Sequence, residues 1–276
     1  MFSRKITKLQ KSPNFEVFYR IFAQRKLGVV ATSIIVSINF FQLNIYLFQS
    51  FKRLTGNTDS IVDILNDVTQ YVYMSNLVNY GTVIYIIVRT IVFVLTLGYF
   101  VLYIIMRKLV KKGRSMKTVE RIFMLLNTYY TMILLLPIMD TLFGEIFCDE
   151  RVLEPMGVHC LEGTHIFIFV LSVISLIVAV YMAVITVFYS MNGIYDKKNY
   201  LSGENKIYEA MITFIRILVT LLMSNNSLTD SFRKLYLSIN LICSLAMIIY
   251  FIIFYPYNKT FIEKFTLMWL TIYLAQ

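Results

Sequence analysis

The sequence predicts an all-α protein, a polytopic transmembrane helical bundle with six full spans and a short or truncated seventh. Uncharged apolar stretches run from Leu27 to Phe51, from Ile166 to Tyr195 and from Leu235 to Asn258. A hydrocarbon core of about 30 Å is crossed by a helix of about 20 apolar residues, so each stretch is long enough to span. The composition agrees, because 58% of residues are hydrophobic and only 15% are charged.

Charged segments divide the chain into elements. The six predicted spans are Leu27–Phe48, Val83–Met106, Ile122–Phe143, His165–Phe188, Ile207–Met223 and Leu235–Tyr255. A seventh apolar run, Phe265–Gln276, is too short to cross the bilayer, so we expect a truncated span or a segment at the interface. Lys26 directly precedes a stretch too long for a signal peptide, which predicts a retained anchor. The domain division is therefore a basic arm at 1–26 and a multi-pass domain at 27–276.

The distribution of Lys and Arg predicts the orientation. The N-terminal arm and the Arg107–Arg121 segment hold seven basic residues each, and alternate sides of the predicted bundle hold nineteen and five. Cytosolic loops carry the excess of basic residues, so we expect the N-terminus to be cytosolic, in either the plasma membrane or an endomembrane. The net charge of +10 thus reflects topology, and no separable basic module for nucleic acid is present. The expected partner of the chain is the lipid bilayer, and the Arg107–Arg121 segment is a candidate site for its anionic lipids.

The end of the N-terminal arm mixes aromatic and basic residues. Phe15–Lys26 fits either a helix in the headgroup region or a short solvated arm.

Four charged residues fall inside predicted spans: Arg89, Asp140, Glu209 and Arg216. A charge at mid-depth costs about 2.5–3.5 kcal/mol on insertion scales, so such residues tend to face other helices or water. Arg89 and Asp140 lie towards the outer ends of antiparallel neighbours. They either form a salt bridge, or Arg89 reaches the headgroups while Asp140 ends its helix in water.

Arg216 lies near the middle of the fifth span, and Glu209 is two turns away on the same face. About 10.5 Å separates them along a helix, so each needs another partner, and we expect Asp140 to pair with Arg216. An ion or proton pathway is the alternative. An isolated Arg and Glu supply neither a relay nor a selectivity ring, which favours a structural pair.

The third loop, in which we place Glu145, concentrates Cys, His and acidic residues. Cys148 and Cys160 enclose eleven residues on the non-cytosolic side, which predicts a disulfide. A zinc site is the alternative, because Cys, His (His159 and His165) and carboxylate ligands are all available here, but the short paired ligand spacing of zinc sites is missing. Cys243, in the sixth span, is interpreted as a buried packing residue.

Catalytic signatures are missing from the chain. The sequence has no phosphate-binding Gly-rich loop, no H-E-x-x-H, no G-x-S-x-G and no second pair of cysteines. A membrane enzyme would need a cluster of His or acidic residues at one interface, and the chain has two His. We therefore expect no enzymatic activity and no cofactor. Pro137 predicts a kink in the third span.

A family resemblance rests on several short motifs. These are the run from Leu136 to Phe143, the two loop cysteines, Gly163 to Phe167, Arg216 to Leu218 and Tyr255 to Asn258. They resemble the membrane region of ciliate and other protist multi-pass proteins of the tiny-macrocyst type. The resemblance implies a helical bundle followed by PAS sensor domains. Eighteen residues follow Asn258, so the PAS part is absent here, and the chain is expected to be a fragment or a stand-alone paralogue.

The resemblance implies that this bundle is the membrane module of a sensory or signalling protein. The alternative is a channel or transporter subunit. A transport pathway needs polar residues that converge on a hydrated cavity near the midplane, whereas a sensor module needs only paired charges and packed apolar faces.

The predicted orientation can be tested by labelling a cysteine placed at Ser115. In intact cells a membrane-impermeant reagent should leave Ser115→Cys unlabelled, because the basic segment faces the cytosol. Labelling without permeabilisation would overturn the topology.

Overall fold

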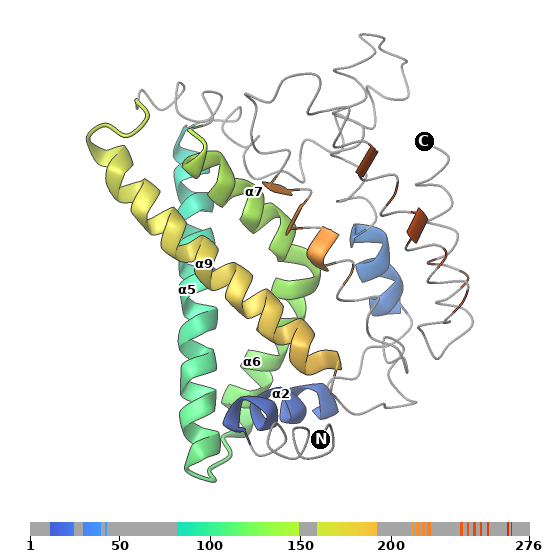
Figure 1. The fold of residues 1–276 in the computed structure, drawn as a ribbon. Helices are drawn as coiled ribbons and strands as arrows, with labels where there is room; N and C mark the ends of the chain where they lie inside the picture. Colours follow the sequence, from blue (N-terminus) through green and yellow to red (C-terminus); the bar gives the residue numbers. More distant parts are fainter. Residues whose placement is uncertain are drawn as a thin grey trace, which may run out of the picture.

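A computed structural model describes residues 12–24, 30–39, 42, 82–148 and 159–191, and isolated residues between 211 and 266. Every regular element in this part of the chain is helical (Figure 1). The elements are α2 (Pro13–Gln24), α5 (Thr82–Lys111), α6 (Lys117–Tyr129), the π-helix η2 (Tyr130–Leu134), α7 (Leu135–Ile146) and α9 (Thr164–Met191).

Three helical segments are long and apolar enough to cross a membrane, which identifies an integral membrane protein. They are Val83–Lys111, Lys117–Ile146 and His165–Tyr189, and they confirm the second, third and fourth predicted spans. A shorter apolar helix, Val30–Asn39, lies within the first predicted span. The fifth and sixth predicted spans and the run Phe265–Gln276 contain only isolated described residues. Their course therefore lies outside the described part of the chain.

The outer surfaces of α5 and α9 are apolar. On α9 the exposed large side chains include Phe167, Val170, Ile174, Ile177 and Val184. α5 presents Val83, Ile87, Ile91, Val94 and Val101 in the same way. Continuous apolar faces of this length are unfavourable in water and suit contact with lipid.

The end of α5 and the turn into α6 follow from one glycine. Gly113 has φ of +63°, and its N–H donates to the carbonyl of Val110 at 3.0 Å. The N–H of Arg114 donates to the carbonyl of Leu109 at 3.0 Å. This pair of bonds is the Schellman motif, which ends a helix at a residue in the left-handed region. The turn between the two helices is thus shorter than the predicted loop Arg107–Arg121, because α5 continues to Lys111 and α6 begins at Lys117.

The third span is a continuous helix interrupted by one π-helical segment. Pro137 has no N–H, so the carbonyl of Ile133 four residues earlier loses its usual donor. The side chain of Gln42 donates to that carbonyl from Nε2 at 2.7 Å. The π-helix η2 contains Ile133 and ends at Leu134, three residues before Pro137. The predicted kink at Pro137 is thus accompanied by a π-helical segment. The carbonyl that Pro137 leaves free is bonded by Gln42, which belongs to the first predicted span.

α7 lies at the centre of the described bundle and packs against α9. Every residue of α7 from Leu135 to Glu145 is buried. The face of α9 towards the bundle interior contains the small residues Ser172, Ser175, Ala179 and Ala183. Small residues at helical spacing allow two backbones to approach closely, which is the usual way membrane helices pack.

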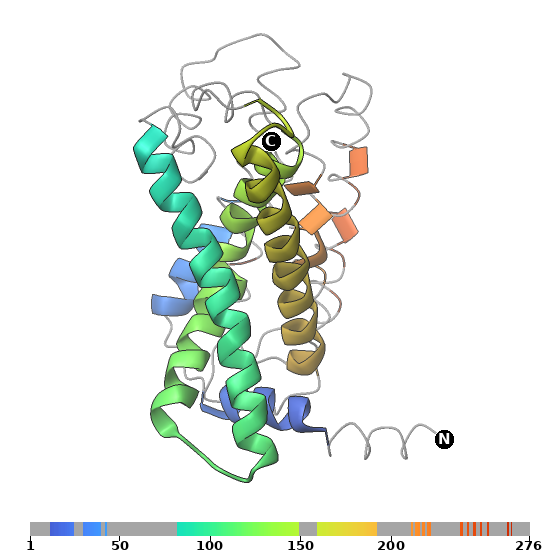
Figure 2. The same ribbon diagram turned by 90° about the vertical axis from the view of Figure 1, so that its left-hand side faces the viewer.

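α2 lies across one end of the bundle (Figures 1 and 2). Pro13 occupies the first helical position, and the hydroxyl of Ser12 accepts a bond from the N–H of Phe15 at 3.1 Å, which caps the helix. Val17, Phe18 and Ile21 are buried, and the ring of Phe18 stacks on Tyr189 of α9 at 5.3 Å. A helix is therefore present over the described part of Phe15–Lys26, and its predicted place in the headgroup region stays a prediction.

One ion pair fastens α2 to α6. Arg20 contacts Glu120 at 3.3 Å and Glu16, one turn earlier, at 2.6 Å. The hydroxyl of Ser115 donates to the same Glu120 carboxylate at 2.9 Å. Hydrogen bonding to Glu16 raises the pKa of the Arg20 guanidinium above its ordinary value, although partial burial opposes this effect. The contact therefore joins α2 to α6 and to the turn that precedes α6.

A buried polar cluster links the three spans on the side of the bundle nearer to α2. Asn127 of α6 accepts hydrogen bonds at Oδ1 from the hydroxyls of Tyr99 on α5 and Thr186 on α9, the latter at 3.0 Å. A second pair lies beside it, where Tyr130 donates to Thr96 at 3.1 Å. Asn127 thus links all three spans through one side chain.

Replacing Asn127 by Ala should lower the free energy of unfolding by about 1–2 kcal/mol, because two buried hydroxyls lose their common acceptor. Unfolding in mixed micelles measures this change. Leu125→Ala is the matched control, since Leu125 lies exposed on the same helix. Equal stability of the two variants would contradict a structural role for the cluster.

Candidate functional site at the disulfide end of the bundle

A buried carboxylate marks the end of the bundle opposite α2. Glu145 lies in the last turn of α7 and its side chain is 0% exposed. The prediction that Glu145 lies in the third loop is wrong, because α7 continues to Ile146. A fully buried carboxylate needs partners, because burying an unpaired charge is costly.

Two residues of α5 provide partners for Glu145. The hydroxyl of Tyr85 donates to Oε1 of Glu145 at 2.9 Å, and Arg89 contacts the same oxygen at 3.4 Å. The Arg89 guanidinium also lies 6.0 Å from the centre of the Tyr85 ring, within the range of a cation–π contact. Tyr85 and Arg89 are one helical turn apart, so one face of α5 delivers both groups.

His165, in the first turn of α9, lies on the other side of the carboxylate. Its imidazole is 0% exposed, and Nδ1 accepts a hydrogen bond from the N–H of Leu161 at 2.9 Å. A neutral ring that accepts at Nδ1 carries its proton on Nε2. Nε2 lies 3.8 Å from Oε2 of Glu145, beyond hydrogen-bond distance, and neither atom has a hydrogen-bond partner among the described residues.

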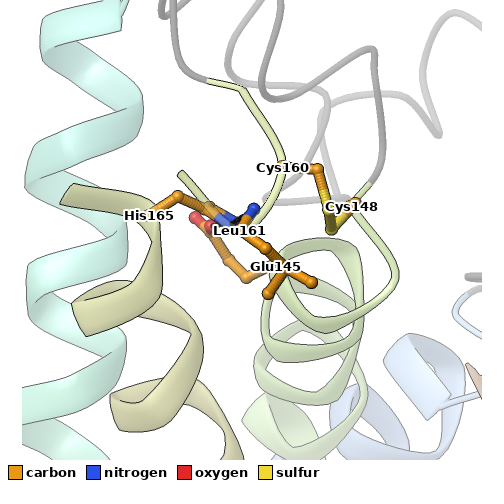
Figure 3. Close-up of a disulfide and its surroundings, with 5 residues drawn as sticks. All are labelled: Glu145, Cys148, Cys160, Leu161 and His165. Carbon is orange, nitrogen blue, oxygen red and sulfur yellow. Dashed lines mark hydrogen bonds and ion pairs between the residues drawn. A yellow bond between two sulfur atoms is a disulfide. The ribbon is translucent and has the colours of Figure 1, made fainter. Parts of the chain in front are cut away.

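The disulfide between Cys148 and Cys160 joins the end of α7 to the segment that leads into α9 (Figure 3). Its Cα atoms are 5.5 Å apart, so the predicted disulfide is confirmed. Cys148 and Leu161 both have positive φ, at 53° and 58°. Non-glycine residues in this region each cost about 1–3 kcal/mol and persist only where neighbouring contacts hold them. The disulfide and the Leu161 to His165 bond are such contacts.

The same residues form one group with the chemistry of a metal site. Ligand atoms of Cys148, Cys160 and His165 all lie within 4.8 Å of one another. In the disulfide form the two sulfurs are bonded to each other, so they are not available as thiolate ligands. The zinc alternative therefore does not apply to this form of the protein.

The structure disagrees with one of the two alternatives for Asp140 and Arg89, in which Asp140 ends its helix in water and Arg89 only reaches the headgroups. Asp140 is 6% exposed and lies inside α7, so it does not end a helix in water. Arg89 is 13% exposed and reaches Glu145, so it does not merely extend to the headgroups. Glu209 and Arg216 lie outside the described residues, as does Cys243, and the expected contact of Arg216 with Asp140 stays a prediction.

Sequence reasoning missed the residues that complete the site. In the sequence Tyr85 is one more residue of an apolar span, and Glu145 follows the predicted end of the third span. The sequence did contain a signal that the helix reaches Glu145. Leu142 and Phe143 continue the apolar run, and Gly144 is the only residue there that disfavours a helix.

Comparisons with known proteins give no relative. No family model, curated protein or solved structure matches the chain.

A double-mutant cycle tests the Arg89 to Glu145 pair. Glu145→Leu alone should destabilise the protein by about 3 kcal/mol, because it removes the carboxylate that the nearby guanidinium contacts. The double variant Arg89→Met with Glu145→Leu should cost less than the sum of the two single changes, with a coupling of about 0.5–3 kcal/mol. Unfolding in mixed micelles gives all four free energies, and additive values would show that the pair is not coupled.

Proposed function

We propose that the chain is the membrane module of a sensory or signalling protein and has no catalytic activity of its own. In this proposal the stimulus acts on the end of the bundle that contains Glu145 and the disulfide. The response is a change in the position of α2 at the opposite end. The resemblance to protist proteins with PAS sensor domains suggests the same role, because their sensing parts are attached to a membrane bundle.

The observation that carries the proposal is the docking of α2. An amphipathic helix that precedes the first predicted span is packed on α5, α6 and α9 through buried apolar residues and the Arg20 to Glu120 pair. A change in the packing of these spans therefore changes the surface on which α2 rests. The pairing of Glu145 with Tyr85 and Arg89 also supports this function, since these groups interact with each other inside the bundle.

A channel or transporter subunit is the second candidate. The hydroxyls of Ser172 and Ser175 on α9 are buried and have no hydrogen-bond partner among the described residues. Polar groups of this kind would suit a hydrated path along α9.

We also propose that anionic lipid binds at the turn between α5 and α6. All seven basic residues there are exposed: Arg107, Lys108, Lys111, Lys112, Arg114, Lys117 and Arg121. Glu120, the acid within this segment, is buried and bonded to Arg20. An exposed cluster of basic residues at the ends of two spans suits the headgroups of anionic lipids, at about 1 kcal/mol per residue.

The proposed coupling between the two ends can be measured with a fluorophore on α2. Tyr19 is partly exposed, so Tyr19→Cys in a Cys243→Ser background can be labelled with an environment-sensitive maleimide while the disulfide is intact. Reduction of the disulfide in metal-free nanodiscs should then change the emission of the fluorophore. Without the covalent link between α7 and α9, these helices can shift relative to α2. The variant with Cys148→Ser and Cys160→Ser should not respond. Unchanged emission from the first protein would contradict the sensory proposal.

Ion flux in proteoliposomes separates the two candidates. The sensory module should give no flux above that of empty vesicles. Flux that Ser172→Ala or Ser175→Ala alters without loss of folding would favour the transport function instead.

A further inference from the structure

We propose that reduction of the Cys148–Cys160 disulfide creates a zinc-binding site whose ligands are the two thiolates and the imidazole of His165. The site lies at the end of the bundle opposite α2, and the proposal does not depend on a sensory function. The disulfide form is the closed state of this site, and the reduced form binds the metal.

The fold already gathers the three ligands. The ligand atoms of Cys148, Cys160 and His165 lie within 4.8 Å of one another, although Cys148 follows α7 and His165 belongs to α9. Zinc ligands in a tetrahedral site lie about 2.0–2.3 Å from the metal, so small movements of released sulfurs are enough to enclose an ion. Cysteine sulfur and histidine nitrogen are the ligands that zinc prefers in proteins.

The surroundings of His165 resemble the outer shell of a metal site. Nδ1 faces the backbone of Leu161, the residue after Cys160, and Nε2 faces Glu145 (Figure 3). A metal-binding histidine usually donates its other ring N–H to a carboxylate, which orients the ring. Oε2 of Glu145 is buried, 3.8 Å from Nε2 and without a hydrogen-bond partner among the described residues. Glu145 is therefore the positioning residue for His165, and Tyr85 and Arg89 hold Glu145 from the other side.

The redox step balances with a thiol reductant. Two reductant thiols become one disulfide and transfer two electrons and two protons to the Cys148–Cys160 bond. The bond breaks and leaves two thiols. Zinc then displaces both protons and binds two thiolates, and the imidazole exchanges the Leu161 N–H for the metal. Three protein ligands leave a fourth position for water.

Metal titration of the purified full chain tests the site. A Cys243→Ser background removes the third thiol. The protein is reduced with a dithiol, freed of reductant under anaerobic conditions, and titrated with Co²⁺ and then with Zn²⁺. We expect about one metal per chain and thiolate-to-cobalt absorption from the reduced protein, lost again when Zn²⁺ displaces Co²⁺. The disulfide form should show neither.

Variants separate the ligands from their neighbours. His165→Ala should abolish tight binding, and Glu145→Gln should weaken it about 10–100-fold while it leaves the cobalt absorption present at saturation. His159→Ala is the matched control, because His159 is exposed and adjacent to Cys160, and it should bind as the parent does. If a variant fails to fold, alkylation of the reduced parent with N-ethylmaleimide gives the same test and should abolish binding.

Two results would overturn the inference. The first is equal metal binding by the reduced and disulfide forms. The second is full binding by folded His165→Ala or by the alkylated parent. An unchanged affinity in Glu145→Gln would remove the positioning role of the carboxylate.

Discussion

Lipid offers no hydrogen bonds, and this constraint governs where the polar groups of the three described spans lie. The outer faces of α5 and α9 carry apolar side chains, while Asn127, Tyr99, Thr186 and Glu145 are turned inward and bonded. The backbone obeys the same rule. The carbonyl that Pro137 leaves without its helical donor is bonded by Gln42. The bundle is therefore held by polar contacts at defined depths, with apolar packing between them.

The polar contacts form three levels along the bundle. Arg20 and Glu120 join α2 to α6 at one end, and Asn127 joins three spans a few turns further from α2. Glu145 joins α7 to α5 at the other end, beside His165 of α9. Each level connects a different set of helices, and the helices themselves join one level to the next. This arrangement suits a module that transmits packing changes.

The sequence allowed the membrane character, three of the spans, the helix at α2 and the disulfide to be predicted. Each follows from a strong one-dimensional signal: uncharged length, amphipathic spacing, or two cysteines in one acidic loop. The site itself depended on weaker signals. Asn127 and Gln42 are neutral residues inside apolar runs. Their hydrogen bonds depend on which helix lies opposite them, and the sequence does not show this. Glu145 was misplaced because a charge near a predicted boundary is ordinarily a loop residue, whereas Tyr85 and Arg89 make its burial tolerable.

The position of η2 suggests where relative movement of the two ends is easiest. The disulfide and the Leu161 to His165 bond fix α7 to α9, and α2 fixes α5, α6 and α9 at the other end. Between these two fastened ends, the third span departs from α geometry at Tyr130–Leu134. A π-helical segment beside a proline has fewer regular backbone bonds to break, so bending there costs less than bending in α6 or α7. Because Gln42 bonds the carbonyl of Ile133 in this segment, the chain around Gln42 is coupled to any bend of the third span.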